Sequence, residues 1–595
     1  MNFQTDYMTQ RPVVESHFKT SDHTSLFYRY WATEDITDKA IILFHRGHEH
    51  SGRIAHLVDE LNLSDYAMFA WDARGHGEND GPRGYSPSLG TSISDVDEFV
   101  RYISTQYQIP LENIIVVGQS VGAVLVSAWV HDYAPKIRGM VLASPAFKVK
   151  LYVPFARSGL GLMQKIRGLF YVNSYVKAKF LTHDEKRIES FNRDPLITRP
   201  IAVNILLELY KTAERVVADA GAITLPTQLF ISGNDHVVHH KPQHQFYERL
   251  NTPIKEKHVL AGFYHDTLGE KERHIPIEKM RSFITKLFEF PRYQHDYQFE
   301  DTWSVSADAF RALTAPLPNW CPKNIAYKIM SKSMSSLGKA SEGIRIGYDK
   351  GFDSGSTLDY VYRDKAQGNG LFGRVMDRQY LNSIGWQGIR QRKVNIENII
   401  RQAIRDLTDS GKPVHIMDIA AGQGRYIFDA INDYGKVQSV LLRDYSPVNV
   451  EQGRLHIKER FLEGKIRFEE GNAFDADDLA AVTPAPTLGV VSGLYELFPS
   501  NELIKASLSG LARAIPSGGL LIYTCQPWHP QVEMIARVLP SHQGGQAWVM
   551  RCRSQGEMDA LVDAAGFEKL NQSIDNCGIF SVSIARRRDP ESNSK

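Results

Sequence analysis

The first half of the chain alternates short apolar runs with helical patterns. Runs typical of buried strands lie at 40–45, 66–72, 113–119, 137–145, 227–233 and 255–262. Such alternation predicts a parallel β-sheet wrapped by helices. Between Phe147 and Ala222 it stops, and a mostly helical stretch of mixed apolar and basic residues follows. This stretch predicts a separate segment inserted between two strands of the sheet.

A second alternation begins near Val394 with a helical pattern. Apolar runs follow at 414–420, 437–444, 465–474, 487–495 and 518–525. They predict a second doubly wound α/β sheet. We therefore expect a first domain over 1–292 with the inserted segment at about 147–222, a connector over 293–335, a second domain over 336–587 and a disordered tail over 588–595.

Composition narrows the class of protein. The chain has 595 residues, 43% apolar and 23% charged, and a net charge of +1, so no strongly basic face for nucleic acid is expected. The first 18 residues lack a basic segment followed by an apolar one, which argues against a secretory signal and favours the cytoplasm. The longest apolar stretch, Ile114–Val130, is shorter than the ~20 residues of a membrane helix and is broken at 118–120.

Cysteine and histidine usage gives no sign of a metal site. Cys321, Cys525, Cys552 and Cys577 lie far apart without CxxC spacing, so reduced thiols are expected. The histidines within 45–50 lie on the predicted oxyanion loop, and those within 236–244 have no nearby carboxylate beyond Asp235, so both groups are interpreted as loop and surface residues.

Residues 118–122 read Gly-Gln-Ser-Val-Gly between a β-branched run and a helical segment. This is the setting of a nucleophile elbow, in which small residues allow a strained strand-to-helix turn that exposes a serine. Ser120 is therefore the predicted nucleophile. The N–H of Val121, directly after it, is the first predicted donor of an oxyanion hole.

A serine triad needs an acid and a histidine at later strand ends. Asp235 follows the predicted strand 227–233, and His265 follows the predicted strand 255–262. We expect Asp235 to orient His265 and His265 to take the proton of Ser120. His258 is a rival base, but it lies inside the predicted strand.

The loop 45–53, His-Arg-Gly-His-Glu-His-Ser-Gly-Arg, resembles that of the monoacylglycerol lipase and lysophospholipase branch of the α/β-hydrolases. The resemblance extends to 72–77, 82–84 and 194–196 and covers about 15–290. It implies an α/β-hydrolase fold with the inserted segment as a cap, and oxyanion donors at Gly47 and Val121. Arg46 departs from the family, which has glycine there. It is expected either to attract a phosphate or carboxylate of the substrate or to point into solvent.

A glycine-containing loop follows the first strand of the second sheet. Asp418 ends that strand, and Gly422 and Gly424 let a ligand approach the backbone closely. Asp444 ends the next strand, where an acid can accept hydrogen bonds from ribose hydroxyls. A dinucleotide site would use the same geometry, but the GxGxxG pattern is missing.

This half resembles class I S-adenosylmethionine-dependent methyltransferases, whose first strand ends in D-x-x-x-G-x-G. The resemblance implies that S-adenosylmethionine is the cofactor and that its binding residues are Asp418, Ala420, Gly422, Gly424, Asp444, Asn472 and Ala473. Asn472 stands where the class has aspartate and is expected near the adenine.

The methyl acceptor is expected near the end of the fourth strand, at Tyr495 and Glu496. The preceding segment 354–393, rich in Tyr, Arg and Gly, is similar to one found ahead of this domain in bacterial hydrolase–methyltransferase fusions. We expect it to fold over the cofactor and help bind the acceptor. A basic, solvated helix face is the alternative.

The leading hypothesis is a bifunctional enzyme of lipid metabolism. Ser120 would cleave an acyl ester through an acyl-enzyme, and the second domain would methylate a small molecule or head group. The apolar and basic inserted segment would contact the membrane surface. The alternatives are a hydrolase regulated by a non-catalytic cofactor-binding domain, and an acyltransferase.

Overall fold

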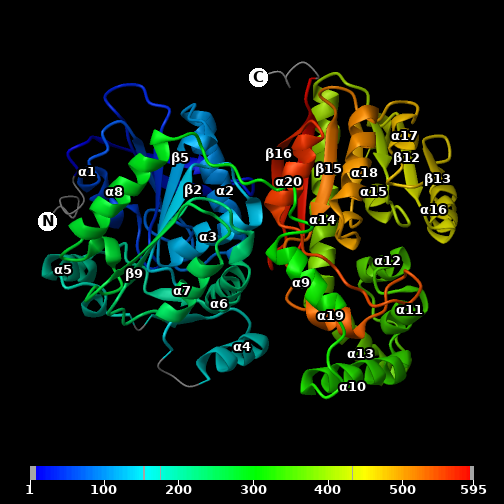
Figure 1. Ribbon diagram of the computed structural model, residues 1–595, viewed down its shortest axis with the longest axis horizontal. Coiled ribbons are helices and arrows are strands. Elements are labelled where there is room, and N and C mark those ends of the chain that lie inside the picture. Colours follow the sequence, from blue (N-terminus) through cyan, green and yellow to red (C-terminus); the bar gives the residue numbers. More distant parts are fainter. Residues whose placement is uncertain (1–8, 152–154, 175, 432, 590–595) are drawn as a thin grey trace. The chain divides into compact units, whose positions relative to one another are not determined.

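The computed structural model describes residues 9–151, 155–174, 176–431 and 433–589 (Figure 1). The chain divides into two compact units, Met1–Asp296 and Tyr297–Lys595. Most of the predicted connector, 293–335, therefore belongs to the second unit, where it contains two helices. Of the predicted disordered tail, 590–595 lie outside the described residues.

The described part of the first unit contains an eight-stranded sheet with the order β1-β2-β4-β3-β5-β6-β9-β10. The six strands β3, β4, β5, β6, β9 and β10 run parallel, whereas β1 and β2 are antiparallel additions at one edge. Their bounds are β1 Val13–Lys19, β2 Ser25–Trp31, β3 Ala40–Phe44, β4 Ala67–Trp71, β5 Ile114–Gln119, β6 Gly139–Ala143, β9 Thr227–Ser232 and β10 Lys255–Leu260. The six parallel strands match the six predicted runs.

Helices cover both faces of this sheet because alternate strand residues point to opposite sides. Ile41 and Leu43 pack in one core with α1 (Leu57–Glu60) and α8 (His274–Glu289). On the other face, Trp71 stacks on Phe99 of α2 (Leu89–Gln106). Helix α3 (Val121–Tyr133) packs against α2 and β5, and α7 (His240–Arg249) follows β9.

The chain leaves the sheet between β6 and β9 to form the cap. Its elements are α4 Ala156–Arg167, β7 Tyr171–Asn173, α5 Glu185–Arg193, β8 Pro200–Ala202 and α6 Val203–Ala218. Strands β7 and β8 pair with each other only, as a small antiparallel sheet. The expected α/β-hydrolase fold with a helical cap is confirmed.

The second unit contains a sheet with the order β13-β12-β11-β14-β15-β17-β16, in which β17 runs antiparallel to both its neighbours. The chain reverses its direction of winding between β11 and β14, and ligands of such sheets bind at this switch point. The bounds are β11 His415–Asp418, β12 Ser439–Asp444, β13 Ile466–Glu470, β14 Leu488–Val491, β15 Leu520–Cys525, β16 Phe567–Ile574 and β17 Ser581–Arg587. The expected Rossmann-like fold is confirmed.

A group of helices precedes this sheet, and others connect its strands (Figure 1). The preceding helices are α9 Val305–Thr314, α10 Pro322–Leu337, α11 Glu342–Lys350, α12 Gly355–Arg363, α13 Gly370–Leu381 and α14 Ile384–Asp409. The others are α15 Arg425–Ala430, α16 Pro447–Glu459, α17 Ala476–Ala480, α18 Asn501–Ala514, α19 Val532–Val538 and α20 Gln555–Ala564. Within the described residues, no helix has the length and apolar character needed to cross a bilayer.

Candidate active sites

Ser120 occupies the sharp turn between β5 and α3. Its backbone has φ 56° and ψ −112°, a strained conformation for a residue with a side chain. The glycines on either side make the turn possible: a Cβ on Gly122 would lie 2.5 Å from the carbonyl oxygen of His45, and one on Gly118 would lie 2.8 Å from Cα of Ala123. The predicted nucleophile elbow is thus present.

The structure brings the three predicted triad residues together. Oγ of Ser120 lies 2.7 Å from Nε2 of His265, and Nδ1 of His265 lies 2.7 Å from Oδ2 of Asp235. With the imidazole proton on Nδ1, Ser120 donates to His265 and His265 donates to Asp235. The rival base, His258, lies inside β10, where its Nε2 contacts Glu256.

Asp235 is held as an anion. Its Oδ1 accepts hydrogen bonds from the N–H groups of Val237 (2.7 Å) and Val238 (2.9 Å). Burial alone would raise the pKa of Asp235, but His265 and these two N–H groups outweigh burial and hold the pKa below its ordinary value. A carboxylate in this position fixes the orientation of the imidazole and stabilises its protonated form.

The two predicted oxyanion donors are neighbours. A Cβ on Gly47 would lie 2.9 Å from Cγ2 of Val121, so the loop after β3 passes directly beside the start of α3. Both residues line a cavity of about 70 Å³ that also reaches Leu125 of α3 and the cap residues Ile201 and Leu209. The apolar part of a substrate would therefore lie between the elbow and the cap.

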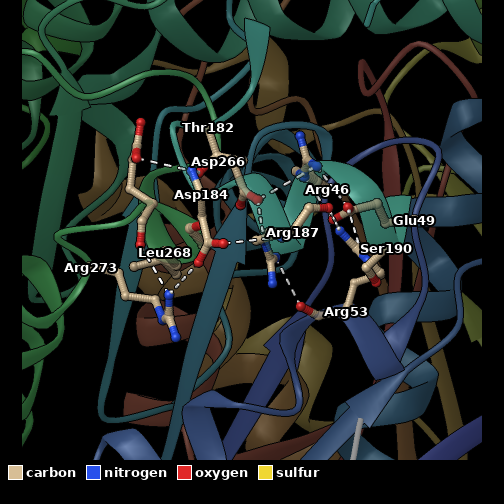
Figure 2. A network of polar contacts seen from close by, with 12 residues as sticks. Arg46, Glu49, Arg53, Thr182, Asp184, Arg187, Ser190, Asp266, Leu268 and Arg273 are labelled. Atoms are coloured by element: carbon tan, nitrogen blue, oxygen red, sulfur yellow. Dashed lines mark hydrogen bonds and ion pairs between the residues drawn. The ribbon is translucent and has the colours of Figure 1, made fainter. Parts of the chain in front are cut away.

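Arg46 fits neither expectation, because its side chain is only 4% exposed and faces other protein groups. Figure 2 shows it in a network of polar contacts. Its Nε and Nη2 donate to the two oxygens of Glu49, both at 2.7 Å, and Nη2 lies 3.7 Å from Oδ2 of Asp266. Glu49 also accepts from Nε of Arg53 at 3.2 Å. Arg46 is thus part of a buried ion cluster and is not solvated, and its guanidinium is paired with Glu49.

The same network ties the cap to both catalytic loops. Arg187 of α5 pairs with Asp266, the residue after His265, and its Nη2 donates to the carbonyl of Arg53 at 2.9 Å (Figure 2). Nη1 of Arg53 in turn donates to Ser190 of α5 at 2.6 Å. The base of the cap thereby holds the oxyanion loop and the histidine loop together.

In the second unit, the predicted glycine loop follows β11. Gly422 and Gly424 have φ of 59° and 76°, conformations that favour glycine, and α15 begins after Gly424. Asp418 is fully buried, accepts hydrogen bonds from the N–H of Ala420 (3.2 Å) and from the hydroxyl of Tyr426, and burial raises its pKa to about 7. These two contacts of its carboxyl group stabilise the conformation of the loop.

Asp444 lies against this loop. Its Oδ2 accepts a hydrogen bond from the N–H of Gly422 at 2.9 Å, and its Oδ1 accepts from Ser446 and Asn449. Asn472 is exposed, with its Oδ1 accepting from the N–H of Phe474 at 3.0 Å, and Ala473 beside it is buried. The structure thus joins Asp444 to the glycine loop, whereas it shows no contact between the side chain of Asn472 and that loop.

Helix α12 covers the glycine loop. Cα of Gly355 lies 3.9 Å from the position of a Cβ on Gly422, and Asp359 pairs with Arg425 of α15. A small cavity between them is lined by Gly422, Ser492 and Arg392, among others. Within the described residues, Oγ of Ser492 and Nε of Arg392 are buried without a hydrogen-bond partner. These donors fit a ligand that carries a carboxylate, as S-adenosylmethionine does.

The two residues expected at the acceptor site, Tyr495 and Glu496, have different surroundings. The side chain of Tyr495 lies in the core with 1% exposure, and its hydroxyl donates to Ser507 at 2.9 Å. Glu496 instead lines a larger cavity, together with residues of α14 and of the segment 526–550.

Arg392 was not predicted individually as a site residue. It is 2% exposed and lies between Ile389 and Ile396 on the buried face of α14, which excludes a solvated position for this residue. The signal in the sequence was an arginine at helical spacing within an apolar stripe.

Comparison with known proteins gives matches for both units. Residues 280–587 match the family described as "Putative methyltransferase", and residues 35–272 match the family described as "Serine aminopeptidase, S33". Over 97% of its length the chain is 59% identical to "Uncharacterized protein YnbC" of Escherichia coli K12, of which it covers 98%.

Other similar proteins match less than half of the chain. Over 41% of the chain it is 26% identical to "Phospholipase YtpA" of Bacillus subtilis, with 93% of that protein covered. Over 42% it is 26% identical to human "Monoglyceride lipase", with 82% covered. The crystal structure of Paleococcus ferrophilus monoacylglycerol lipase is 22% identical with a TM-score of 0.41, over 44% of this chain and 99% of that one. The chain therefore belongs to the family described as "Putative methyltransferase", is related to YnbC over 97% of its length, and has a lipase-like serine hydrolase domain as its first unit.

Proposed function

We propose that the first unit hydrolyses the acyl ester of a lipid such as a monoacylglycerol or a lysophospholipid. The hydrogen-bonded series Ser120–His265–Asp235 carries this proposal. The apolar cavity beside Val121 and the similarity to proteins named phospholipase and monoglyceride lipase support a lipid ester.

The geometry supports a two-step reaction. Oγ of Ser120 attacks the ester carbonyl carbon while its proton passes to Nε2 of His265, and the N–H groups of Gly47 and Val121 stabilise the oxyanion. His265 returns the proton to the departing alcohol, which leaves an acyl-enzyme. Water, deprotonated by His265, then releases the fatty acid and restores Ser120.

Fatty-acid release by the purified full chain from monoacylglycerols, lysophospholipids and p-nitrophenyl esters of increasing acyl length tests this proposal. We expect hydrolysis, with a preference for medium or long chains over acetate. Transfer of the acyl group to an added alcohol in place of water would identify an acyltransferase. No release from any of these esters would contradict the lipid proposal.

Helix α4 of the cap is proposed as the contact with an anionic membrane surface. It exposes Leu162 (61%) and Ile166 (78%), and Phe155 directly before it is 88% exposed. Lys165 and Arg167 are exposed on the same helix. Apolar side chains beside basic ones are typical of helices that lie in the membrane interface.

Replacing Ile166 by aspartate should reduce binding of the chain to phosphatidylglycerol vesicles about tenfold. The variant loses an apolar side chain that would be buried in the membrane, and the anionic lipids repel the new carboxylate. Cosedimentation measures this. Ile36→Asp is the matched control, because Ile36 is fully exposed outside the cap. Equal loss in both variants, or none in either, would contradict membrane contact through α4.

We propose that the second unit is an S-adenosylmethionine-dependent methyltransferase, so that the chain is bifunctional. Gly422 and its neighbours, Asp444, Ser492 and Arg392 would hold the cofactor. When bound, the cofactor would supply an electrophilic methyl group to an acceptor that gives up a proton. The chain needs only to orient the acceptor and receive the proton.

Label transfer from tritiated S-adenosylmethionine to a lipid extract tests this function, with the Gly422→Arg variant as the negative control. A side chain at Gly422 would occupy the space along the loop and meet a positive φ. We expect binding and transfer by the wild type and neither by the variant. Cofactor binding without transfer to any extract would favour the non-catalytic, regulatory alternative.

Asp418→Asn should stabilise the second unit increasingly as the pH rises. Because burial raises the pKa of Asp418 from 3.8 to about 7, wild-type stability is complete below about pH 4, declines between about pH 4 and pH 7, and loses nothing further from this group above that range. The variant lacks this decline, so the difference should approach about 4 kcal/mol near pH 8 and vanish near pH 4. Denaturant unfolding at several pH values measures it, with the exposed Asp409→Asn as control. A difference that does not change with pH would show that Asp418 is ionised in the folded chain.

A further inference from the structure

The second unit encloses a cavity of about 310 Å³, within the size range of small-molecule sites. Most of its wall is apolar and comes from elements far apart in the sequence, namely Met334, Ile344, Trp386, Met534, Trp548 and Phe580. Arg392 and Leu358 line both this cavity and the small cavity along the glycine loop, and Gly493 and the adjacent Ser492 each line one of them. The two cavities therefore adjoin.

The wall of the large cavity includes a carboxylate, one oxygen of which lacks a hydrogen-bond donor. Glu496 is 6% exposed, and its Oε1 accepts from the hydroxyl of Thr524 at 2.8 Å. Its Oε2 is buried and, among the residues that the structure describes, has no partner. A buried carboxylate oxygen without a donor costs free energy, so a bound molecule that donates a hydrogen bond there would be stabilised.

The charges of Glu496 and Arg392 disfavour a charged ligand next to them. Nη1 of Arg392 lies 3.7 Å from Oε1 of Glu496, so the two side chains balance each other within the buried wall. An ammonium group at Glu496 would lie close to the guanidinium, and a carboxylate would lie close to Glu496. An uncharged hydroxyl meets neither repulsion and supplies the missing donor.

The remaining polar groups of the wall are uncharged apart from Asp353, whose carboxylate accepts hydrogen bonds from Ser541 and from the N–H of His542. Burial lowers the pKa of His529 to about 4, so its imidazole is neutral, and its Nδ1 accepts from the N–H of Gln531 at 3.0 Å. Nε1 of Trp548 is buried and has no acceptor among the described residues. Such walls suit a largely apolar molecule with few polar groups.

We propose that this cavity binds the methyl acceptor, and that the acceptor is an uncharged, largely apolar small molecule whose hydroxyl donates to Oε2 of Glu496. This inference rests on the methyltransferase function proposed for the second unit. Oε2 would also receive the hydroxyl proton, because Glu496 lines the cavity and Oε2 has no hydrogen-bond donor among the described residues. The side chain of Glu496 thereby determines both the position of the acceptor and its chemical class.

Equilibrium dialysis of the full chain with 2-naphthol and with 2-methoxynaphthalene tests the proposal without the cofactor. The two probes share an apolar ring system, but only the first donates a hydrogen bond. We expect the wild type to bind 2-naphthol about tenfold more tightly, since a hydrogen bond to a charged group has about this effect. Glu496→Gln should reduce the preference to about threefold or less, and the exposed Glu502→Gln on α18 should keep it tenfold.

Two further measurements separate the outcomes. Met534→Trp fills the cavity and should weaken both probes more than tenfold, while its melting temperature shows whether the unit is folded. Equal affinity of the wild type for both probes, no binding of either, or full binding by a folded Met534→Trp variant would each overturn the cavity assignment. Binding of labelled S-adenosylmethionine is measured separately. Its failure alongside the expected naphthol binding would overturn the methyltransferase function, and with it the acceptor role of the cavity.

Discussion

Replacing Ser120 by alanine should lower the rate of ester hydrolysis by about 10⁴-fold or more, because no other hydroxyl lies within hydrogen-bond distance of Nε2 of His265 in the described structure. The fold should persist, because alanine meets the same backbone strain at φ 56° as serine does. Initial rates of p-nitrophenyl ester cleavage at saturating substrate measure the effect on kcat. Substrate binding should change little.

Ser127→Ala is the matched control for this variant. Ser127 lies on α3, the helix that follows Ser120; it is fully buried, and its hydroxyl donates to the carbonyl of Ala123. We expect activity close to that of the wild type. A Ser120→Ala enzyme that retained a tenth of the activity would show that hydrolysis occurs without this nucleophile, and the proposed acyl-enzyme would then be wrong.

Replacing Glu49 by glutamine should destabilise the first unit by about 3–5 kcal/mol, because it leaves the buried cations of Arg46 and Arg53 without their shared anion. All three side chains are at most 4% exposed, so water cannot replace the lost charge. For a unit of this size we expect the melting temperature to fall by about 10 °C. Calorimetry, or thermal unfolding followed by circular dichroism, measures the shift.

Glu189→Gln provides the comparison within the same unit. Glu189 pairs with Arg193 on α5, but both side chains are more than half exposed. Exposed ion pairs contribute at most about 1 kcal/mol. Equal melting temperatures for the two variants would mean that the buried network in Figure 2 contributes no more to stability than a surface pair.

Local sequence was sufficient for the hydrolase site but not for its surroundings. Ser120, Asp235 and His265 each follow a strand whose apolar pattern is clear, and parallel strands bring such ends together. Arg46 was misjudged because Glu49 is near in sequence but Asp266 and Phe191 are not, and its guanidinium lies over the ring of Phe191 as well as near Asp266. Burial by distant segments is not visible in a single loop sequence.

The same limit applies to the second unit. The pattern around Asp418, Gly422 and Asp444 predicted a loop and an acid that do meet. The large cavity was not predicted, since its walls come from helices before the sheet and from loops after β15 that meet only through tertiary packing. Tyr495 and Glu496 are adjacent in sequence, but Glu496 lines the large cavity, whereas Tyr495 packs in the core.

The buried cluster around Arg46 also restricts how the oxyanion loop can evolve. Replacing Arg46 by glycine would leave Asp266 with Arg187 but without Arg46 nearby. The effect of any change at 46 therefore depends on what stands at 49, 187 and 266. Such coupling makes a single substitution by glycine at 46 costly, although glycine is smaller and conformationally freer.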